Sequence, residues 1–128
     1  MKIIKVDLDK DIKELTIIPL SDVHIGDKLS NLKLLKECLE RIKKEPHTYT
    51  IINGDFCNTA LKNSKSDVYA DSMSPMEQMN TMVDLLEPIK DKILVIAPGN
   101  HEQRILRETR SGALEPGEAL DLIWSFYK

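Results

Sequence analysis

The sequence is poor in the residues on which several protein classes depend. Its 128 residues include two cysteines, too few for a disulfide framework, and no apolar run approaches the roughly 20 residues that span a bilayer. Met1 does not begin a signal peptide. With 18 basic against 21 acidic residues, the chain lacks a broad basic surface for nucleic acid, although a local basic site stays open. We therefore expect a cytoplasmic protein without a membrane partner.

Histidine is also scarce, because only His24, His47 and His101 occur. The rest of the composition is that of an ordinary globular protein, with 41% hydrophobic and 30% charged residues. A chain of this length fits one domain, and it could bury about two thirds of its unfolded surface. We expect a single domain over residues 1–128, without internal repeats.

Apolar strand patterns and amphipathic helix patterns alternate along the chain. We expect strands at residues 4–8, 15–20, 49–52 and 93–97, of which the first two could pair as a hairpin around a turn at 9–11. We expect helices at residues 31–44, 74–88 and 102–107, a long loop at 58–73, and a last amphipathic patch at 119–127. This order predicts an α/β fold in which helices cover a parallel sheet.

Both longer helices carry sequence signals for their ends. Asn31 is suited to the N-cap of the first helix, and Pro46 cannot continue that helix. Ser74, Pro75 and Glu77 form a capping box with proline at its preferred first position. The expected inner stripes are Leu32, Leu35, Leu39 and Ile42 in the first helix, and Met76, Met79, Val83 and Leu86 in the second.

Three short polar clusters follow three of the expected strands. They are Asp22-Val23-His24, Gly54-Asp55 with Asn58, and Gly99-Asn100-His101-Glu102. Ligands of open α/β sheets bind beyond the carboxyl ends of the strands, so these clusters should converge in space. Each cluster alone fits an ordinary turn, whereas three clusters in this order indicate a functional site.

The residue types in these clusters suit a metal-assisted reaction. Asp22 and His24 could hold one cation with an oxygen and a nitrogen, and the two oxygens of Asp55 could bridge two cations. Asn100 offers a neutral oxygen ligand, which adds no charge near an anionic substrate. His101 could protonate a leaving group or stabilise phosphoryl oxygens.

The three clusters resemble the first three motif blocks of the calcineurin-like metallophosphoesterase family, and residues 74–107 are similar to its phage and prophage members. The resemblance implies hydrolysis of a phosphomonoester or phosphodiester by a metal-activated water. It implies two divalent ions (Mn, Fe, Zn or Mg) with the ligands Asp22, His24, Asp55 and Asn100. His101 would be the catalytic histidine and would contact the substrate together with Asn100. Asn58 would orient His101, at a position where many relatives have an aspartate.

The resemblance also implies residues that this sequence does not contain. Family members continue with further histidine ligands, including a Gly-His-x-His block, whereas no histidine follows His101 here. We therefore expect the N-terminal half of an αββα metallophosphoesterase sandwich, a truncated form of the domain. Such a fragment should bind at most one ion, weakly, through Asp22, His24 and Asp55, and its activity should be impaired.

Several features have a second interpretation. The whole chain could be a non-catalytic α/β interaction or scaffold module that retains the phosphoesterase motifs. Arg104 could contact a substrate phosphate or lie on a solvated face. Cys57 could bind a metal or only fill space, and His47 fits an exposed turn.

The expected partners follow from the fold and the family. The substrate would be a phosphoester, and DNA, nucleotides and phosphoproteins all stay open. A sheet face without a covering layer, or the C-terminal helix with Trp124, could pair two copies of the chain. We therefore expect a homo-oligomer.

Overall fold

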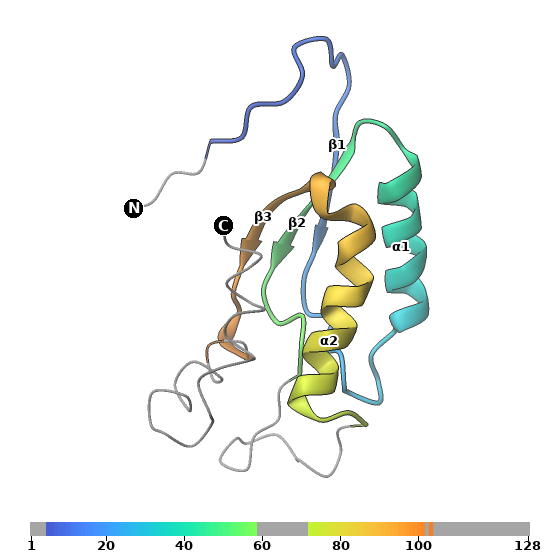
Figure 1. The fold of residues 1–128 in the computed structure, drawn as a ribbon, viewed down its shortest axis with the longest axis vertical. Coiled ribbons are helices and arrows are strands. Elements are labelled where there is room, and N and C mark those ends of the chain that lie inside the picture. The colour runs from blue at the N-terminus through green and yellow to red at the C-terminus, as the bar shows by residue number, and fades with distance from the viewer. Residues whose placement is uncertain (1–4, 59–71, 102, 104–128) are drawn as a thin grey trace.

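The computed structural model describes residues 5–58, 72–101 and 103 of the chain. In chain order the elements are β1 Thr16–Leu20, α1 Leu32–Lys44, β2 Thr48–Asn53, α2 Pro75–Leu86, the 3₁₀-helix η1 Glu87–Lys92, and β3 Ile93–Ala97. The three strands form one parallel sheet in the order β1-β2-β3, and both α-helices flank it (Figure 1). The predicted α/β fold class is confirmed. None of the helices in the described part is long and apolar enough to cross a membrane.

One apolar core joins the sheet to its helices. In the middle strand, Ile52 pairs with Leu20 of β1 on one side and with Ile96 of β3 on the other. The helical residues packed into the same core are Leu35, Leu39 and Ile42 of α1, Leu86 of α2 and Ile89 of η1. Because α1 and α2 share this core, they stand side by side against the sheet (Figure 1).

Both helices begin where the sequence predicts. The side chain of Asn31 accepts a hydrogen bond from the backbone N–H of Leu34 at 3.1 Å, so it is the N-cap of α1. At α2, Ser74 Oγ accepts from the backbone N–H of Glu77 at 3.3 Å, and Glu77 Oε2 accepts from the backbone N–H of Ser74 at 2.8 Å. The hydrogen bond from the Ser74 backbone holds the pKa of Glu77 below its usual range.

The prediction of a strand and hairpin before β1 is wrong. Residues 5–15 form no strand, and only the turn at residues 9–11 is present. Val6 is exposed because this segment pairs with none of the described strands. β1 itself is amphipathic rather than buried, since Ile17 is 45% exposed.

The inner face of α2 is rotated relative to the prediction. Met76, expected in the core, is exposed, whereas Gln78 is fully buried beside Met79. Of the helix expected at 102–107, only Gln103 is described; it is helical, as are Asn100 and His101, so this helix begins before the predicted position. Arg104, the patch at 119–127 and most of the loop expected at 58–73 lie outside the described residues.

A polar cluster lies where α1 leads into β2. Lys92 Nζ donates to the carbonyl of Ile42 at 2.7 Å and also to the carbonyl of Glu45, so it caps the C-terminus of α1. The buried Thr48 donates from Oγ1 to Glu45 Oε2 at 2.7 Å, and Arg41 pairs with the same carboxylate. These bonds, the one from Thr48 first, hold the pKa of Glu45 below its usual range.

Candidate metal centre

The first two motif loops stay paired after their strands end. Asp22 N–H donates to the carbonyl of Gly54 at 3.2 Å, and His24 N–H donates to the carbonyl of Asp55 at 3.1 Å. Ile25 then forms an isolated parallel bridge with Cys57. The hydrogen bonding of the sheet therefore continues into the loops and fixes the first cluster against the second.

Three residues of these loops have an unusual backbone. Asp22, His24 and Asp55 have positive φ values of 54°, 50° and 51°, in the left-handed region. This conformation costs roughly 1–3 kcal/mol for a residue that is not glycine, and such strain is concentrated at functional sites. Asp and His tolerate it better than most residues. All three residues with these positive φ values belong to the polar clusters identified in the sequence.

Two glycines let the second and third loops approach each other closely. A Cβ added to Gly54 would lie 2.6 Å from the Cα of Gly99 and 2.7 Å from its nitrogen. A Cβ added to Gly99 would in turn lie 2.7 Å from Cγ of Asp55. Only glycine fits at both positions, so this contact sets the distance between Asp55 and the loop that carries His101.

The approach of the loops brings three possible metal ligands together. One ligand atom each from His24, Asp55 and His101 lies within 4.8 Å of the others, and all three residues are partly buried. The two imidazole rings meet edge to face, with centroids 4.7 Å apart and planes inclined by 80°. Two nitrogens and a carboxylate in this arrangement match the donor set of Zn, Mn or Fe sites.

Asn58 contacts both histidines of this group. Its side-chain Oδ1 lies 3.3 Å from Nδ1 of His24, and its backbone carbonyl accepts from Nδ1 of His101. Because a backbone carbonyl oxygen only accepts hydrogen bonds, Nδ1 of His101 carries a proton and donates it to Asn58. Asn58 thus orients the rings of both His24 and His101 through Nδ1, which leaves Nε2 of each ring directed away from Asn58.

The carboxylate of Asp55 is bound by the third loop. Its Oδ1 accepts from the backbone N–H of His101 at 3.0 Å. The Asn100 amide, with its nitrogen turned toward Asp55, donates to Oδ2 at 2.7 Å and to Oδ1 at 2.9 Å. With the amide turned the other way, its oxygen would face both carboxylate oxygens, which requires a cation between them. The side chain therefore fits Asp55 with or without an ion.

Residues 15–127 match the family described as calcineurin-like phosphoesterase (Metallophos). The match covers most of the chain. This chain belongs to the calcineurin-like phosphoesterase family. No curated protein and no solved structure matches the chain.

The structure places the predicted ligands at different distances from the three-residue group. Of the predicted metal ligands, His24 and Asp55 lie in the three-ligand group, and Asn100 borders it through Asp55. Asp22 lies at its margin, with Oδ1 3.9 Å from Nε2 of His24 and a side chain that is 69% exposed. His101, predicted as the catalytic histidine, stands among the possible ligands. The roles of these residues stay predictions.

Two features of the phosphoesterase site were not expected from the sequence. Asn58, predicted to orient His101, contacts that ring through its backbone carbonyl, and its side chain also contacts His24. Ser21 Oγ contacts Asp22 Oδ2 and also the carbonyl of Asn53, so it joins the first cluster to the end of β2. A serine directly before an aspartate is too common to have signalled this contact.

Proposed function

We propose that this member of the phosphoesterase family hydrolyses phosphoesters at a site built for one divalent ion. The observation that supports it is the convergence of His24, Asp55 and His101 from three segments, each following the carboxyl end of a strand. Within the residues that the structure describes, these three form the one group of possible metal ligands, and His47 lies apart from it in the turn before β2. A single ion is therefore the expected content.

The ion would be held by Asp55 and His24, with Asp22 and the oxygen of Asn100 within reach of a rotated side chain. When bound, it would supply a Lewis acid that polarises the phosphoryl group and makes water a better nucleophile. A second ion would have Asp55 and Asn100 as its protein ligands, one of them a neutral amide. We expect that position to bind poorly, so hydrolysis should be slow.

The remaining chemistry belongs to the residues of the chain. Nδ1 of His101 faces the Asn58 carbonyl, so Nε2 is the ring atom that can exchange a proton with a leaving oxygen. Asn58 holds that orientation through its backbone carbonyl, which no substitution of its side chain removes directly. Asn100 can turn its amide nitrogen toward a phosphoryl oxygen without adding negative charge.

The test combines metal binding with hydrolysis. Calorimetric titration with Mn²⁺ should show weak binding of one ion per chain, and the protein should hydrolyse bis(4-nitrophenyl) phosphate slightly above background. The variant Asp55→Ala should lose both signals, whereas Asp84→Ala, an exposed aspartate on α2, should retain both. Rapid turnover that disappears in Asp55→Ala would show a more complete site than the one proposed.

A non-catalytic scaffold is the second candidate function. It is favoured by the hydrogen bonds that Asp55 receives from Asn100 and from the His101 backbone, since they satisfy the carboxylate without an ion. In that case the wild type would bind no Mn²⁺. Asp55→Ala would then behave like the wild type in every binding and hydrolysis assay.

A further inference from the structure

The turn that carries His24 is held by residues outside the three motifs. The backbone N–H of Asp27 donates to the carbonyl of His24 at 3.0 Å and closes the turn. Gly26 lies in its third position with φ of 103°, a left-handed conformation that favours glycine. The turn begins with His24, itself in a strained conformation, so its shape decides where the imidazole lies.

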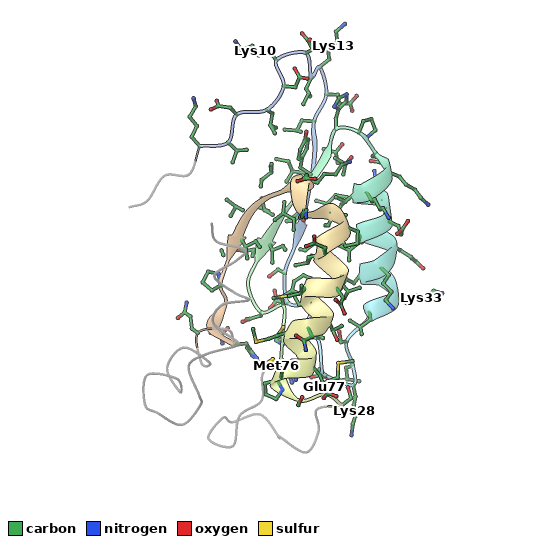
Figure 2. All side chains as sticks on the ribbon, in the orientation of Figure 1. Lys10, Lys13, Lys28, Lys33, Met76 and Glu77 are labelled. Atoms are coloured by element: carbon green, nitrogen blue, oxygen red, sulfur yellow. The ribbon has the colours of Figure 1, made fainter. Side chains whose placement is uncertain are left out.

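The start of α2 holds this turn from one side. The carbonyl of Gly26 accepts from the backbone N–H of Ser72 at 2.8 Å and from its Oγ at 3.0 Å. The side chain of Gln78 packs directly on the Cα of Gly26, where an added Cβ would lie 2.8 Å from Cγ of Gln78 and closer still to its amide. In Figure 2, Met76 and Glu77 at the start of α2 lie at the same end of the molecule as Lys28, just after the turn.

Gln78 is an unusual residue for this position. It is fully buried, and burial of an amide costs free energy unless its polar atoms are hydrogen-bonded. Its Nε2 donates to the carbonyl of Met73 at 3.0 Å. This bond fixes the amide across the segment that carries Ser72, so Gln78 and Ser72 together form a rigid support under Gly26. A methionine or leucine would fill the volume but could not make this bond.

We propose that Gln78 is a positioning residue for His24, acting through Gly26 and the Ser72 segment. Loss of the amide lets the turn at residues 24–27 relax. His24 then moves away from Asp55 and His101, with which it forms the possible ligand group. The effect on metal binding rests on the proposed function, whereas the displacement of His24 does not.

The main test is Gln78→Met, which keeps the length and helix propensity of the side chain but removes its donor. The ring signals of the three histidines are recorded by NMR in the metal-free protein. The His24 signals should shift, and those of the exposed His47 should stay in place as an internal control. Where the wild type binds Mn²⁺, its affinity should fall by about tenfold in the variant, the lower range for residues that orient ligands.

Two further variants separate positioning from stability. Ser72→Ala removes only the hydroxyl bond to Gly26, so it should fold and shift the His24 signals by a smaller amount. Ile42→Val lowers core packing in α1 and should leave both the His24 signals and Mn²⁺ affinity unchanged. Unmoved His24 signals in both Gln78→Met and Ser72→Ala would overturn the proposal. A wild type that binds no Mn²⁺ would refute the metal site, and the metal-free spectra would still decide the role of Gln78.

Discussion

The two ends of the three-stranded sheet are built in contrasting ways. At the end where α1 leads into β2, Lys92 caps the α1 carbonyls and Thr48 binds the side chain of Glu45. At the carboxyl ends of the strands, Asp22, His24 and Asp55 have left-handed backbones, and the rings of His24 and His101 meet edge to face. One end satisfies its polar groups with ordinary geometry. The other end holds its polar residues in backbone conformations that are unfavourable for residues other than glycine.

This contrast indicates how the molecule divides stability from chemistry. Strained residues persist only where their surroundings over-determine them, and here the sheet-like pairing of the loops supplies that restraint. The end around Lys92 contributes stability without chemistry. Substitutions at the end around Lys92 should therefore change the free energy of unfolding alone. Substitutions at the carboxyl ends of the strands should change both the free energy of unfolding and the affinity for Mn²⁺.

The largest effect is expected where the two loops touch. Gly54→Ala adds a Cβ against Gly99 and forces an alanine to φ of 76°, so we expect a destabilisation of about 3 kcal/mol or more. Urea unfolding measures it, with Asn53→Ala, at an exposed neighbouring side chain, as the control. Equal stability of the two variants would mean that the loops can separate without cost.

The next effect should be confined to the opposite end. Lys92→Met removes two hydrogen bonds from a charged donor, so the free energy of unfolding should fall by about 1.5–3 kcal/mol while Mn²⁺ affinity stays unchanged. Lys90→Met, which removes only an exposed pair with Glu87, should change stability little. A parallel loss of metal affinity in Lys92→Met would show that the two ends are coupled.

A smaller effect of opposite sign is expected at the site. Asp22→Gly relieves a left-handed conformation, so stability should rise by up to about 1 kcal/mol while Mn²⁺ binding weakens. Asp7→Gly, at a residue without positive φ, gives the reference for added chain flexibility. The contrast between strained and relaxed ends would fail if Asp22→Gly lost stability.

The smallest effect concerns acid. The pKa of Glu77 is lowered by its bond from the Ser74 backbone, so its contribution is complete above the ordinary value of 4.5 and is lost as the pH falls below that value. Glu77→Gln should flatten this acid limb of stability in circular-dichroism melts. An unchanged pH profile in that variant would contradict the role of the capping box.

The sequence predicts those features that depend on local interactions. Asn31 and Ser74 mark the helix starts because a capping side chain bonds within three residues of itself. The glycine, aspartate and histidine clusters meet as predicted because parallel strands bring their carboxyl ends to one edge. Residues 5–8 do not form a strand, since alternation reports an amphipathic segment but not whether a partner strand exists.

The features that were missed depend on contacts between distant segments. Gln78 is buried because Gly26, 52 positions earlier, leaves space for it. No sequence pattern near either residue predicts this contact. Asn58 contacts His24 with its side chain and His101 with its backbone carbonyl, an arrangement that motif spacing does not specify. Motif spacing predicts which residues meet but not how they pair.

The contact between Gly54 and Gly99 also limits how the sequence can evolve at these two positions. Every amino acid other than glycine carries a Cβ, so any replacement at either position strikes the opposite backbone. A Cβ at Gly54 meets main-chain atoms of Gly99 and Pro98, and a Cβ at Gly99 meets both the backbone nitrogen and the side chain of Asp55. No second mutation elsewhere removes these main-chain atoms. No single substitution at Gly54 or Gly99 is therefore expected to be neutral. Descendants that keep this arrangement of the backbone must keep both glycines.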